Sequence, residues 1–474
     1  MQSAVLKYVD EEVVKRLLKV FDFSIFFLAA LIFSTLFAKL PVVPDQGAVI
    51  GFFTLTIALL SVFTIRDLQL YEPKSLVNGW WIFAKTSSSI IICGFTLFTI
   101  LDRFLLPMDA LWLVAWAATT IAYVGVTRFG AQLWARPIAR LGRFRKRIAI
   151  VGGGKAAEDA LQALESSHSL NHEIVGLFDD RFDARSPHSI RKYEKIGKIS
   201  ELATYARNNR IDLIIVAIPL SAEARLLYIL KRLWELPVDI RISGQASSLK
   251  LSPSAYTYIG LLPLLSVFDR PLDGWGLFLK NAMERALSCV AIVIFAPVML
   301  AVAAAIRMES KGPIIFKQKR YGFNNELVEV FKFRSMFTDL ADANATKLVT
   351  KGDPRVTHVG HFIRKASLDE LPQLFNVLTG QLSLVGPRPH ATQAKAADTL
   401  YEQVVDGYFA RHKVRPGITG WAQINGWRGE TDTREKLEQR VKHDLEYIDG
   451  WSLMFDLMII LRTPFALLKS ENAY

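Results

Sequence analysis

Long apolar stretches alternate with short polar segments in the amino-terminal part of this chain. Four of these stretches approach the length of about 20 residues that a helix needs to cross a bilayer, and their interiors are nearly free of charged side chains. They cover residues 21–38, 47–65, 86–106 and 110–126. No small-residue cleavage site follows the first stretch, so we expect a membrane anchor there rather than a removed signal peptide.

The lysines and arginines around these stretches predict which side of the membrane each end faces, because cytoplasmic loops are enriched in positive charge. Basic residues precede the first stretch, lie between the second and third, and follow the fourth. The other loops hold little beyond Lys39 and Arg103. Both termini, and everything after Val126, are therefore expected on the cytoplasmic side.

The pattern changes near residue 146 to short apolar runs separated by helical periods. The run RIAIVGGGKAAEDALQAL is typical of a strand, a glycine turn and a helix. Further strands are expected at residues 212–218 and 238–242. This segment therefore predicts a parallel α/β sheet.

The glycine turn gives this sheet a candidate ligand site. Gly152-x-Gly154-x-x-Ala157 fits a relaxed dinucleotide-binding fingerprint, and Asp179 ends the following strand. Gly152, Gly154 and Asp179 are therefore candidate cofactor-binding residues. Glycine turns also close strand–helix units without any ligand, and the third glycine of the fingerprint is absent, so a structural role is the alternative.

A fifth apolar segment, residues 286–306, is also long enough to cross the membrane. Lysine or arginine lies on both sides of it, which marks both ends as cytoplasmic. Pro297 lies in its middle, where proline breaks or bends a helix. We therefore expect a re-entrant helix over residues 282–307, with a complete fifth span as the alternative. A last apolar run, residues 451–468, contains Asp456 and predicts either an interfacial or a core helix.

The composition agrees with a membrane protein, since hydrophobic residues make up 51% of the 474 residues. The net charge is +12, but much of the excess lies beside the apolar stretches, where it sets orientation and attracts anionic membrane lipids. There is no zinc-ligand spacing and no basic–aromatic stripe, so no nucleic-acid partner is expected. Cys93 and Cys289 both lie in apolar segments and are expected to be structural thiols in a reducing compartment.

Two adjacent acids, Asp369 and Glu370, lie where the sequence predicts the start of a short helix. Pro372 suits a first helical turn, and Gly380 marks the helix end. Both carboxylates would then lie at the positive end of a helix dipole, where phosphate also binds. Paired acids flanked by arginines suit phosphoryl transfer through an acyl phosphate. The alternative is ordinary helix capping, because Ser367-x-x-Glu370 is also a capping box.

Three long motifs surround this pair: KFRSM, DPRVTHVGHFIRKASLDELPQLFNVLTGQLSLVGPRPH and RHKVRPGITGWAQINGWRGETDT. Over residues 280–470 they make the chain resemble the bacterial sugar transferases, which act as polyisoprenyl-phosphate hexose-1-phosphate transferases. The block NGWRGETDT and the four apolar stretches are similar to the long undecaprenyl-phosphate glucose phosphotransferases. Those proteins start exopolysaccharide or capsule repeat units.

The resemblance implies a phosphotransferase (EC 2.7.8.-) that moves a hexose-1-phosphate from a UDP-sugar to undecaprenyl phosphate and releases UMP. Glucose-1-phosphate is the expected group, with galactose-1-phosphate as the alternative. Asp369 is implied as the nucleophile that carries the phosphosugar, and Glu370 as the catalytic acid that binds Mg²⁺. Basic residues are expected to bind the substrate phosphates, because guanidinium matches phosphate in two-pronged geometry. They are Arg364, Arg388, Arg415 and, from the KFRSM motif, Lys332 and Arg334.

Together, the patterns and the resemblance predict an α/β membrane protein in three parts. A four-helix transmembrane bundle covers residues 1–145, a Rossmann-like parallel α/β domain covers 146–270, and a C-terminal α/β catalytic domain with the re-entrant membrane helix covers 275–474. The resemblance implies a multi-pass protein of the bacterial inner (plasma) membrane, with its catalytic domain in the cytoplasm and membrane lipids around it. A homodimer is left open.

Two other functional classes compete with this interpretation. Membrane-anchored nucleotide-sugar epimerase/dehydratases share four spans and a Rossmann domain, but they need Tyr-x-x-x-Lys, and no tyrosine here has lysine four positions later. A membrane sensor whose α/β domain binds a nucleotide would leave the acid pair without a task. Neither class releases UMP from UDP-glucose, so this release distinguishes them from a transferase.

Overall fold

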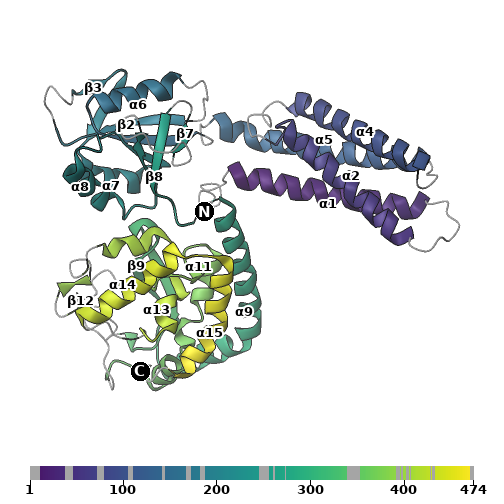
Figure 1. The fold of residues 1–474 in the computed structure, drawn as a ribbon. Coiled ribbons are helices and arrows are strands. Elements are labelled where there is room, and N and C mark those ends of the chain that lie inside the picture. The colour runs from purple at the N-terminus through teal and green to yellow at the C-terminus, as the bar shows by residue number, and fades with distance from the viewer. Residues whose placement is uncertain are drawn as a thin grey trace. The chain divides into compact units, whose positions relative to one another are not determined.

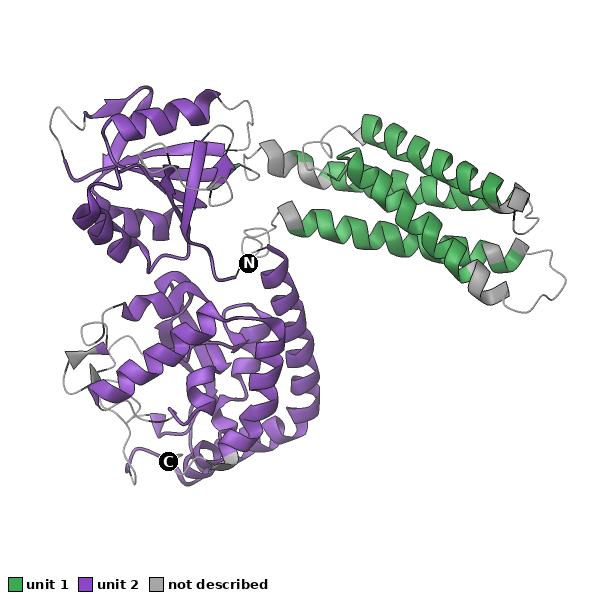
Figure 2. Ribbon diagram, in the orientation of Figure 1, with its two compact units in different colours: residues 1–145 green, residues 146–474 purple. Residues whose placement is uncertain are grey.

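The computed structural model describes residues 11–37, 46–71, 79–104, 110–140, 145–166, 172–181, 187–244, 256–259, 262–272, 274–338, 353–390, 395–396, 399–401, 405, 407–427, 429 and 433–469. The chain divides into two compact units, Met1–Arg145 and Lys146–Tyr474 (Figure 2).

The first unit is built from long helices. Its described residues form α1 (Glu11–Phe37), α2 (Gln46–Asp67), α4 (Gly79–Phe104) and α5 (Ala110–Arg140) (Figure 1). Each of α1 and α4 packs against both α2 and α5. Stacked, fully buried Trp112 and Trp116 lie in the interior, and the indole nitrogen of Trp116 donates to the Phe26 carbonyl at 3.2 Å. The polar edge of that ring is thus satisfied inside an apolar core.

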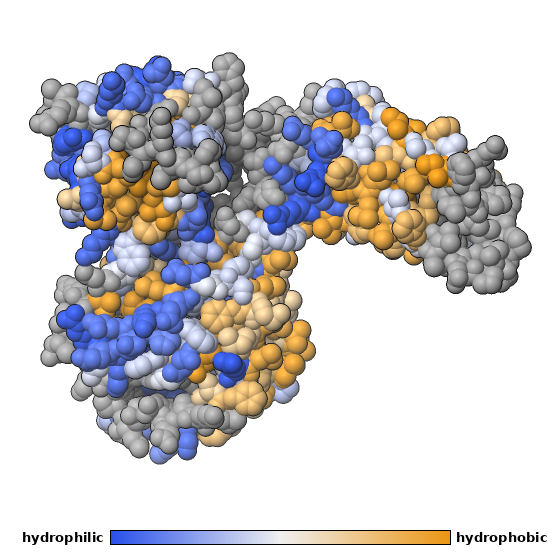
Figure 3. Space-filling view, in the orientation of Figure 1, coloured by the Kyte–Doolittle hydropathy of each residue, from blue (hydrophilic) through white to orange (hydrophobic). Residues whose placement is uncertain are grey.

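Apolar side chains also cover much of the outer surface of these helices (Figure 3). Such surfaces are unfavourable in water but suit a lipid environment. Within the described part of the chain, three helices are long and apolar enough to cross a membrane: Trp80–Ile100, Leu111–Leu133 and Gly274–Glu309.

The predicted spans fall inside the helices of the first unit. α4 and α5 contain residues 86–106 and 110–126, and α1 and α2 contain 21–38 and 47–65, except that residues 38, 105 and 106 lie outside the described ranges. α1 and α2 are not among the three helices named above, and their crossing stays a prediction.

A buried ion pair joins two of these helices. Asp22 on α1 accepts a hydrogen bond from Arg128 on α5 at 2.5 Å, and both side chains are fully buried. The hydroxyl of Tyr71, just after α2, donates to the same carboxylate at 2.8 Å. The charge at the edge of the first apolar stretch is therefore balanced by a protein partner rather than by water.

The second unit begins with an eight-stranded sheet of described residues in the order β3-β4-β2-β1-β5-β6-β8-β7. The run from β4 to β6 is parallel, while β3, β8 and β7 pair antiparallel with their neighbours. The predicted parallel α/β sheet is confirmed. The strands are β1 (Lys146–Val151), β2 (His172–Phe178), β3 (Ser189–Ile190), β4 (Tyr193–Gly197), β5 (Leu213–Val216), β6 (Asp239–Ser243), β7 (Tyr256–Ile259) and β8 (Leu262–Phe268).

Helices cover both faces of this sheet, as expected for parallel strands that are apolar on both sides. α6 (Lys155–Ser166) packs on the face that holds Ile150 of β1. α7 (Ile199–Asn208) and α8 (Glu223–Leu233) pack on the opposite face, which holds the next residue of the same strand, Val151. The arrangement is the doubly wound one.

A single long helix, α9 (Gly274–Glu309), follows the sheet. Its outer face exposes apolar side chains, among them Val293, Ile294 and Leu300, and this surface is visible in Figure 3. Its inner face packs against the rest of the unit. The helix is continuous through Pro297, whose ring lies on the exposed outer face, so the chain does not leave the helix at the predicted break. The re-entrant course of this helix stays a prediction.

The remaining elements pack around the inner face of α9. Their last helix, α15 (Leu453–Lys469), buries Asp456 and Ile459 while it exposes Met454 and Leu461. One face of it is therefore part of the core, and an interfacial role for the other face stays a prediction. The others are β9 (Ile315–Tyr321), β10 (Leu327–Phe333), α10 (His358–Lys365), η6 (Leu368–Glu370), α11 (Gln373–Leu378), β11 (Ser383–Val385), β12 (Lys395–Ala396), β13 (Thr399–Leu400), η7 (Tyr408–Lys413), β14 (Gly417–Thr419), α13 (Trp421–Ile424) and α14 (Arg434–Asp449), besides the short η4 (Phe323–Asn325).

Candidate active site

The acid pair lies on a sharp turn between two short helices. Ser367 takes a left-handed backbone conformation with a φ of 56°, and Leu368–Glu370 form a 3₁₀ turn. The helical turn thus begins at Leu368, next to Asp369 as predicted, and it is a 3₁₀ turn, with the α-helix following from Gln373. Pro372 lies between the two with helical dihedral angles, and because it has no N–H to bond back into the preceding turn, the 3₁₀ turn closes before the proline and the α-helix starts after it.

Two further predictions concern Ser367, which precedes the acid pair, and Gly380, which follows α11. The side chain of Ser367 makes no capping hydrogen bond, so the alternative of a capping box has no support in the structure. Gly380 follows α11 with a φ of +78°, as expected for the residue that ends a helix. The turn therefore presents two carboxylates that do not serve as helix caps.

Two cations hold the carboxylate of Glu370. Lys332 on β10 donates to Oε1 at 2.9 Å, and Arg388 donates to Oε2 at 3.2 Å and makes a shorter contact with Oε1. Burial by itself would raise the pKa of Glu370, but the charges of Arg388 and Lys332 outweigh it and hold the pKa well below its ordinary range. Glu370 is therefore a fixed negative charge at neutral pH.

Asp369 differs from its neighbour. Its carboxylate makes no hydrogen bond or ion pair with any residue in the described ranges. Burial, and after it the negative charge of Glu370, raises the pKa of Asp369 above its ordinary value, against the opposing charges of Lys332 and Arg364. Two adjacent acids thus have different environments, which is the usual sign of different roles.

The loop around Arg388 is fixed through its backbone. Arg411, which is fully buried, donates to the carbonyl of Arg388 at 2.8 Å. Arg320 on β9 donates to the carbonyl of Pro389 at 2.5 Å. Because Pro387 and Pro389 also restrict the backbone on either side, the guanidinium of Arg388 is directed before any substrate binds.

Arg320 is a member of this charge cluster that the sequence prediction missed. Burial, and then the positive charge of Arg388, lowers the pKa of Arg320 to about 10, while the charges of Glu370 and Asp369 act in the opposite direction. Its guanidinium also contacts Gln318 at 2.8 Å, two residues earlier on the same strand. The alternation of Gln318 and Arg320 on one face of a strand is the signal that could have found it.

The other predicted phosphate-binding residues lie at different distances from the acid pair. Arg364, at the end of α10, acts on the charge of Asp369. Arg415 lies beside α9, where it donates to Asn281 and, at 3.3 Å, to the carbonyl of Gly380. Arg364 is thus brought near Asp369, and Arg415 is held at the end of α11.

Arg334 is not brought to the acid pair. It is buried at the C-terminal end of α9 and donates to the carbonyls of Ser310 at 2.8 Å and Lys311 at 2.6 Å. A cation there satisfies carbonyls that have no partner within the helix. Strand β10 ends at Phe333, so Arg334 does not share the direction of Lys332, and its position does not support the predicted contact with phosphate.

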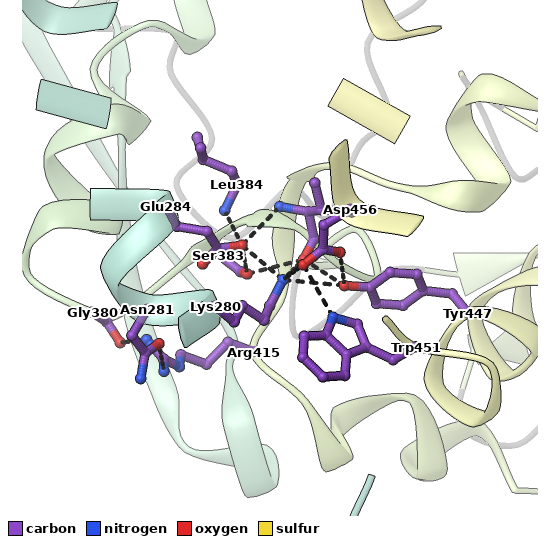
Figure 4. A network of polar contacts seen from close by, with 11 residues as sticks. Lys280, Asn281, Glu284, Gly380, Ser383, Leu384, Arg415, Tyr447, Trp451 and Asp456 are labelled. Carbon is purple, nitrogen blue, oxygen red and sulfur yellow. Dashed lines mark hydrogen bonds and ion pairs between the residues drawn. The ribbon is translucent and has the colours of Figure 1, made fainter. Parts of the chain in front are cut away.

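Behind the site, a buried cluster of charges joins α9, β11 and α15 (Figure 4). We call it the Lys280 cluster, and it consists of Lys280, Glu284, Tyr447 and Asp456. Lys280 Nζ donates to Glu284 and to Asp456 at 2.7 Å each, and the Tyr447 hydroxyl donates to Asp456 at 2.7 Å. The single positive charge of Lys280 is therefore shared by two buried carboxylates, and hydrogen bonds such as that from Tyr447 stabilise the remaining negative charge.

The Lys280 cluster also fixes strand β11, which leads directly to the Arg388 loop. Glu284 accepts hydrogen bonds from the backbone N–H groups of Leu384 at 3.1 Å and Val385 at 3.3 Å, and Lys280 donates to the Val385 carbonyl at 3.1 Å. Helix α9 and the loop that carries Arg388 are thus held together by hydrogen bonds to charged groups, which are stronger than neutral ones.

The acid pair has limited capacity for a metal ion. The described residues contain no group of three or more His, Cys, Asp or Glu side chains arranged to hold one. Mg²⁺ is often bound by only one or two carboxylates together with substrate phosphates and water. Oε1 of Glu370 contacts both Lys332 and Arg388, whereas Oε2 accepts from Arg388 and keeps a lone pair for a metal ion, and Asp369 is open among the described residues. The pair therefore fits a Mg²⁺ ion whose remaining ligands come from a bound diphosphate and water. It does not by itself form a complete metal site.

The candidate cofactor residues of the sheet all have structural tasks. Gly152 has a φ of +123°, and a Cβ there would lie 2.7 Å from the Ala217 carbonyl, so close packing alone requires glycine. The carbonyl of Gly154 accepts from the N–H of Ala157 at 2.9 Å at the start of α6. Asp179 is fully buried and ion-paired with arginines on both sides of it. A ligand at this turn stays a prediction.

Comparison with known proteins identifies the family. Residues 275–470 match the model of the bacterial sugar transferases, and residues 74–244 match that of a CoA-binding domain. The UDP-glucose:undecaprenyl-phosphate glucose-1-phosphate transferase of Klebsiella pneumoniae is 38% identical to this chain over 76% of each protein. The chain belongs to the bacterial sugar transferase family.

Two further members of the bacterial sugar transferase family bear on its specificity. A protein of Escherichia coli (strain K12) with the same name as the Klebsiella relative is 35% identical over 82% of this chain and 84% of its own length. The undecaprenyl-phosphate galactose phosphotransferase of Salmonella typhimurium (strain LT2) is 28% identical over 87% of this chain and 84% of its own length. The transferase described here is thus more similar to these two glucose transferases than to the galactose transferase.

Proposed function

We propose that this sugar transferase moves glucose-1-phosphate from UDP-glucose to undecaprenyl phosphate, releases UMP, and so starts the repeat unit of an exopolysaccharide. The names of its relatives support the reaction class, and the higher identity to the glucose transferases supports glucose over galactose. The acceptor is a lipid phosphate and the donor a nucleotide diphosphate, so both substrates are anions whose charge the site must balance.

The chemistry proposed is covalent. A carboxylate oxygen of Asp369 attacks the β-phosphorus of UDP-glucose, the bond to UMP breaks, and UMP leaves with the electron pair. A phosphate oxygen of the acceptor then attacks the same phosphorus, and Asp369 leaves as a carboxylate. The observation that carries this assignment is the difference between the acids: Glu370 is engaged by Lys332 and Arg388, whereas Asp369 has no bond to any described residue.

The cations around the pair act on the phosphates. Lys332, Arg320 and Arg388 provide fixed positive charge, which lowers the repulsion between the donor diphosphate and an attacking carboxylate. Glu370, with the donor phosphates, would hold Mg²⁺. When bound, this ion would offset charge on the diphosphate and on the departing UMP.

The location proposed for the reaction is the cytoplasmic face of the inner membrane, with α9 as a re-entrant helix that bends at Pro297 within one leaflet. The support is that both ends of α9 pack on the same domain. Its first turns hold β11 through Lys280 and Glu284, and its last turns are capped by Arg334. A helix that crossed completely would put those two ends on opposite sides of the membrane. A helix that dips into one leaflet keeps the acid pair at the level of lipid headgroups.

The test uses membranes that contain the full-length protein, undecaprenyl phosphate, and UDP-sugars labelled in the sugar. UDP-glucose should give UMP and labelled lipid faster than UDP-galactose or UDP-N-acetyl sugars. With the donor alone, acid quenching should leave label on the protein. Faster transfer of galactose would overturn the sugar assignment, and absence of UMP release would favour a membrane sensor or an epimerase instead.

A further inference from the structure

An apolar pocket of about 210 Å³ lies directly beside the turn that carries the acid pair. Glu370 and Ser367 lie at its polar side. Ala291 and Phe295 of α9 and Ala466 of α15 form walls that lie on the two helices with exposed apolar surfaces. The pocket therefore has an apolar end and a polar end at Glu370, behind which Lys332 and Arg388 supply positive charge, as an amphipathic anionic ligand requires.

The outer surroundings of the pocket connect its apolar end to the lipid environment. Phe295 is 41% exposed, and its neighbour Ile294 on α9 is 64% exposed. On α15, Phe465 is 67% exposed beside Ala466. Figure 3 shows apolar surface over the region of α9. A chain that enters from the lipid can thus reach the pocket without passing through water.

The polar groups of the wall are largely satisfied by one another. The hydroxyls of Thr419 and Thr463 form a hydrogen bond of 2.8 Å, and Thr463 also donates to the Ile459 carbonyl at 2.8 Å. Gln423 donates to the Ile418 carbonyl at 3.3 Å, and a bound water would satisfy its remaining oxygen. Most of the wall therefore offers dispersion contacts and does not compete for a sugar or a phosphate.

We propose that this pocket binds the first isoprene units of the polyprenyl phosphate acceptor, an inference that rests on the proposed function. The acceptor phosphate must reach Asp369 and Glu370, and the carbons attached to it then need an apolar space that starts at this turn. The donor UDP-glucose has no apolar chain to place there. A dry cavity of about 150 Å³ holds one benzene molecule, so the present pocket holds one or two isoprene units and not a whole chain.

The pocket acts on the acceptor and not on the donor, and this difference makes the proposal testable. Ala466→Trp fills the pocket, while Leu461→Trp places the same ring on the same helix at a position that is 70% exposed. With full-length protein in lipid nanodiscs, Ala466→Trp should raise the KM for undecaprenyl phosphate at least about tenfold, because burial of several carbon atoms is lost. Leu461→Trp should leave that KM within about twofold.

The donor half of the reaction serves as the internal control. Exchange of labelled UMP into UDP-glucose without acceptor should be unchanged within about twofold in Ala466→Trp, which also shows that the variant is folded. An equal loss of exchange would overturn the proposal, as would an unchanged acceptor KM. If even the unaltered protein shows no exchange, the covalent function fails, and the pocket is then judged from the acceptor KM alone.

A second comparison separates the acceptor from ordinary membrane lipid. The unaltered protein should use a short prenyl phosphate better than a saturated alkyl phosphate of equal length, and Ala466→Trp should lose this preference. If the KM for acceptor depends instead on the acyl chains of the nanodisc lipid, and the prenyl preference is absent, the pocket holds bulk lipid and the proposal is wrong.

Discussion

Two acids of this chain, Asp179 in the sheet and Asp369 on the turn after α10, both lie among arginines, yet their availability is opposite. Asp179 accepts from Arg181 and Arg225 at 3.0 Å each and is fully buried. Asp369 has no hydrogen bond or ion pair within the described ranges, and the nearby cations are held by Glu370. Similar local composition therefore produces a closed structural ion cluster in one region and an open carboxylate in the other.

The difference shows which feature of a charge cluster indicates chemistry. A carboxylate has about four lone-pair sites, and one that is surrounded by fixed donors has little capacity to accept a substrate. A second acid that occupies the cations, as Glu370 does, leaves its neighbour free to react. The glycine fingerprint beside Asp179 drew attention in the sequence, but its acid is already engaged.

The largest effect is expected from Asp369→Asn. The amide keeps the size of the side chain but is a poor nucleophile, so exchange of UMP into UDP-glucose should fall by about 10³-fold or more. Label should also be absent from protein quenched after incubation with donor alone. If the Asp369→Asn variant exchanged UMP as fast as the unaltered protein, the open carboxylate would not be the reacting group. The difference between the two acids would then say nothing about the chemistry.

Glu370→Gln should give a smaller loss of rate, about 10- to 100-fold, together with a shift in pH dependence. The negative charge of Glu370 contributes to the raised pKa of Asp369, and the substitution also frees Lys332 and Arg388 to act on Asp369. Both changes lower the pKa of Asp369. Since the nucleophile must be deprotonated, the acid limb of the exchange rate should move to lower pH.

The pH profile of exchange, measured at several magnesium concentrations, checks this expectation. A shift of the acid limb to higher pH would contradict the assigned coupling between the two acids. An unchanged dependence on magnesium would remove Glu370 from the proposed metal site, while leaving the role of Asp369 intact.

Glu284 extends the comparison, because it is saturated like Asp179 but lies inside the catalytic domain. Glu284→Gln removes the negative charge from the oxygen that accepts from Lys280 and from the N–H groups of Leu384 and Val385, so stability should fall by about 1–3 kcal/mol. A thermal unfolding transition in nanodiscs measures this loss. Glu438→Gln, in the exposed pair with Arg434, is the matched control and should change stability by less than about 0.5 kcal/mol. Equal effects of the two substitutions would show that the Lys280 cluster does not hold the domain.

The features that could be predicted from the sequence depend on residues that are contiguous in the chain. The parallel sheet follows from short apolar runs and helical periods, and the acid pair and Arg388 lie in one unbroken motif. The helical turn beside Asp369 was predicted, but its 3₁₀ type was not, because the sequence pattern does not distinguish a 3₁₀ turn before Pro372 from an α-helix.

The features that could not be predicted depend on contacts between distant residues. Lys280 and Asp456 are 176 positions apart, and neither has a local pattern that indicates an ion pair. Arg320 joins the site only because β9 pairs with β10 and brings it beside Glu370. Arg334 lies away from the site because strand β10 ends at Phe333, one residue earlier. Periodicity gives the direction of a side chain within an element but not its partners across the fold.

The smallest effect on catalysis is expected from Asp179→Asn, and it completes the comparison with Asp369. Glucose transfer should stay within about twofold, because the arginines around Asp179 stabilise the sheet and contact no reacting group. Stability of the second unit should fall by about 1–2 kcal/mol, since two cations lose their buried partner. Glu173→Gln is the control on β2, the strand that ends directly before Asp179, because Glu173 is exposed and pairs with Arg147 at 3.5 Å. If Asp179→Asn instead stopped glucose transfer while the protein stayed folded, the closed cluster of the sheet would have to bind a ligand that the reaction needs.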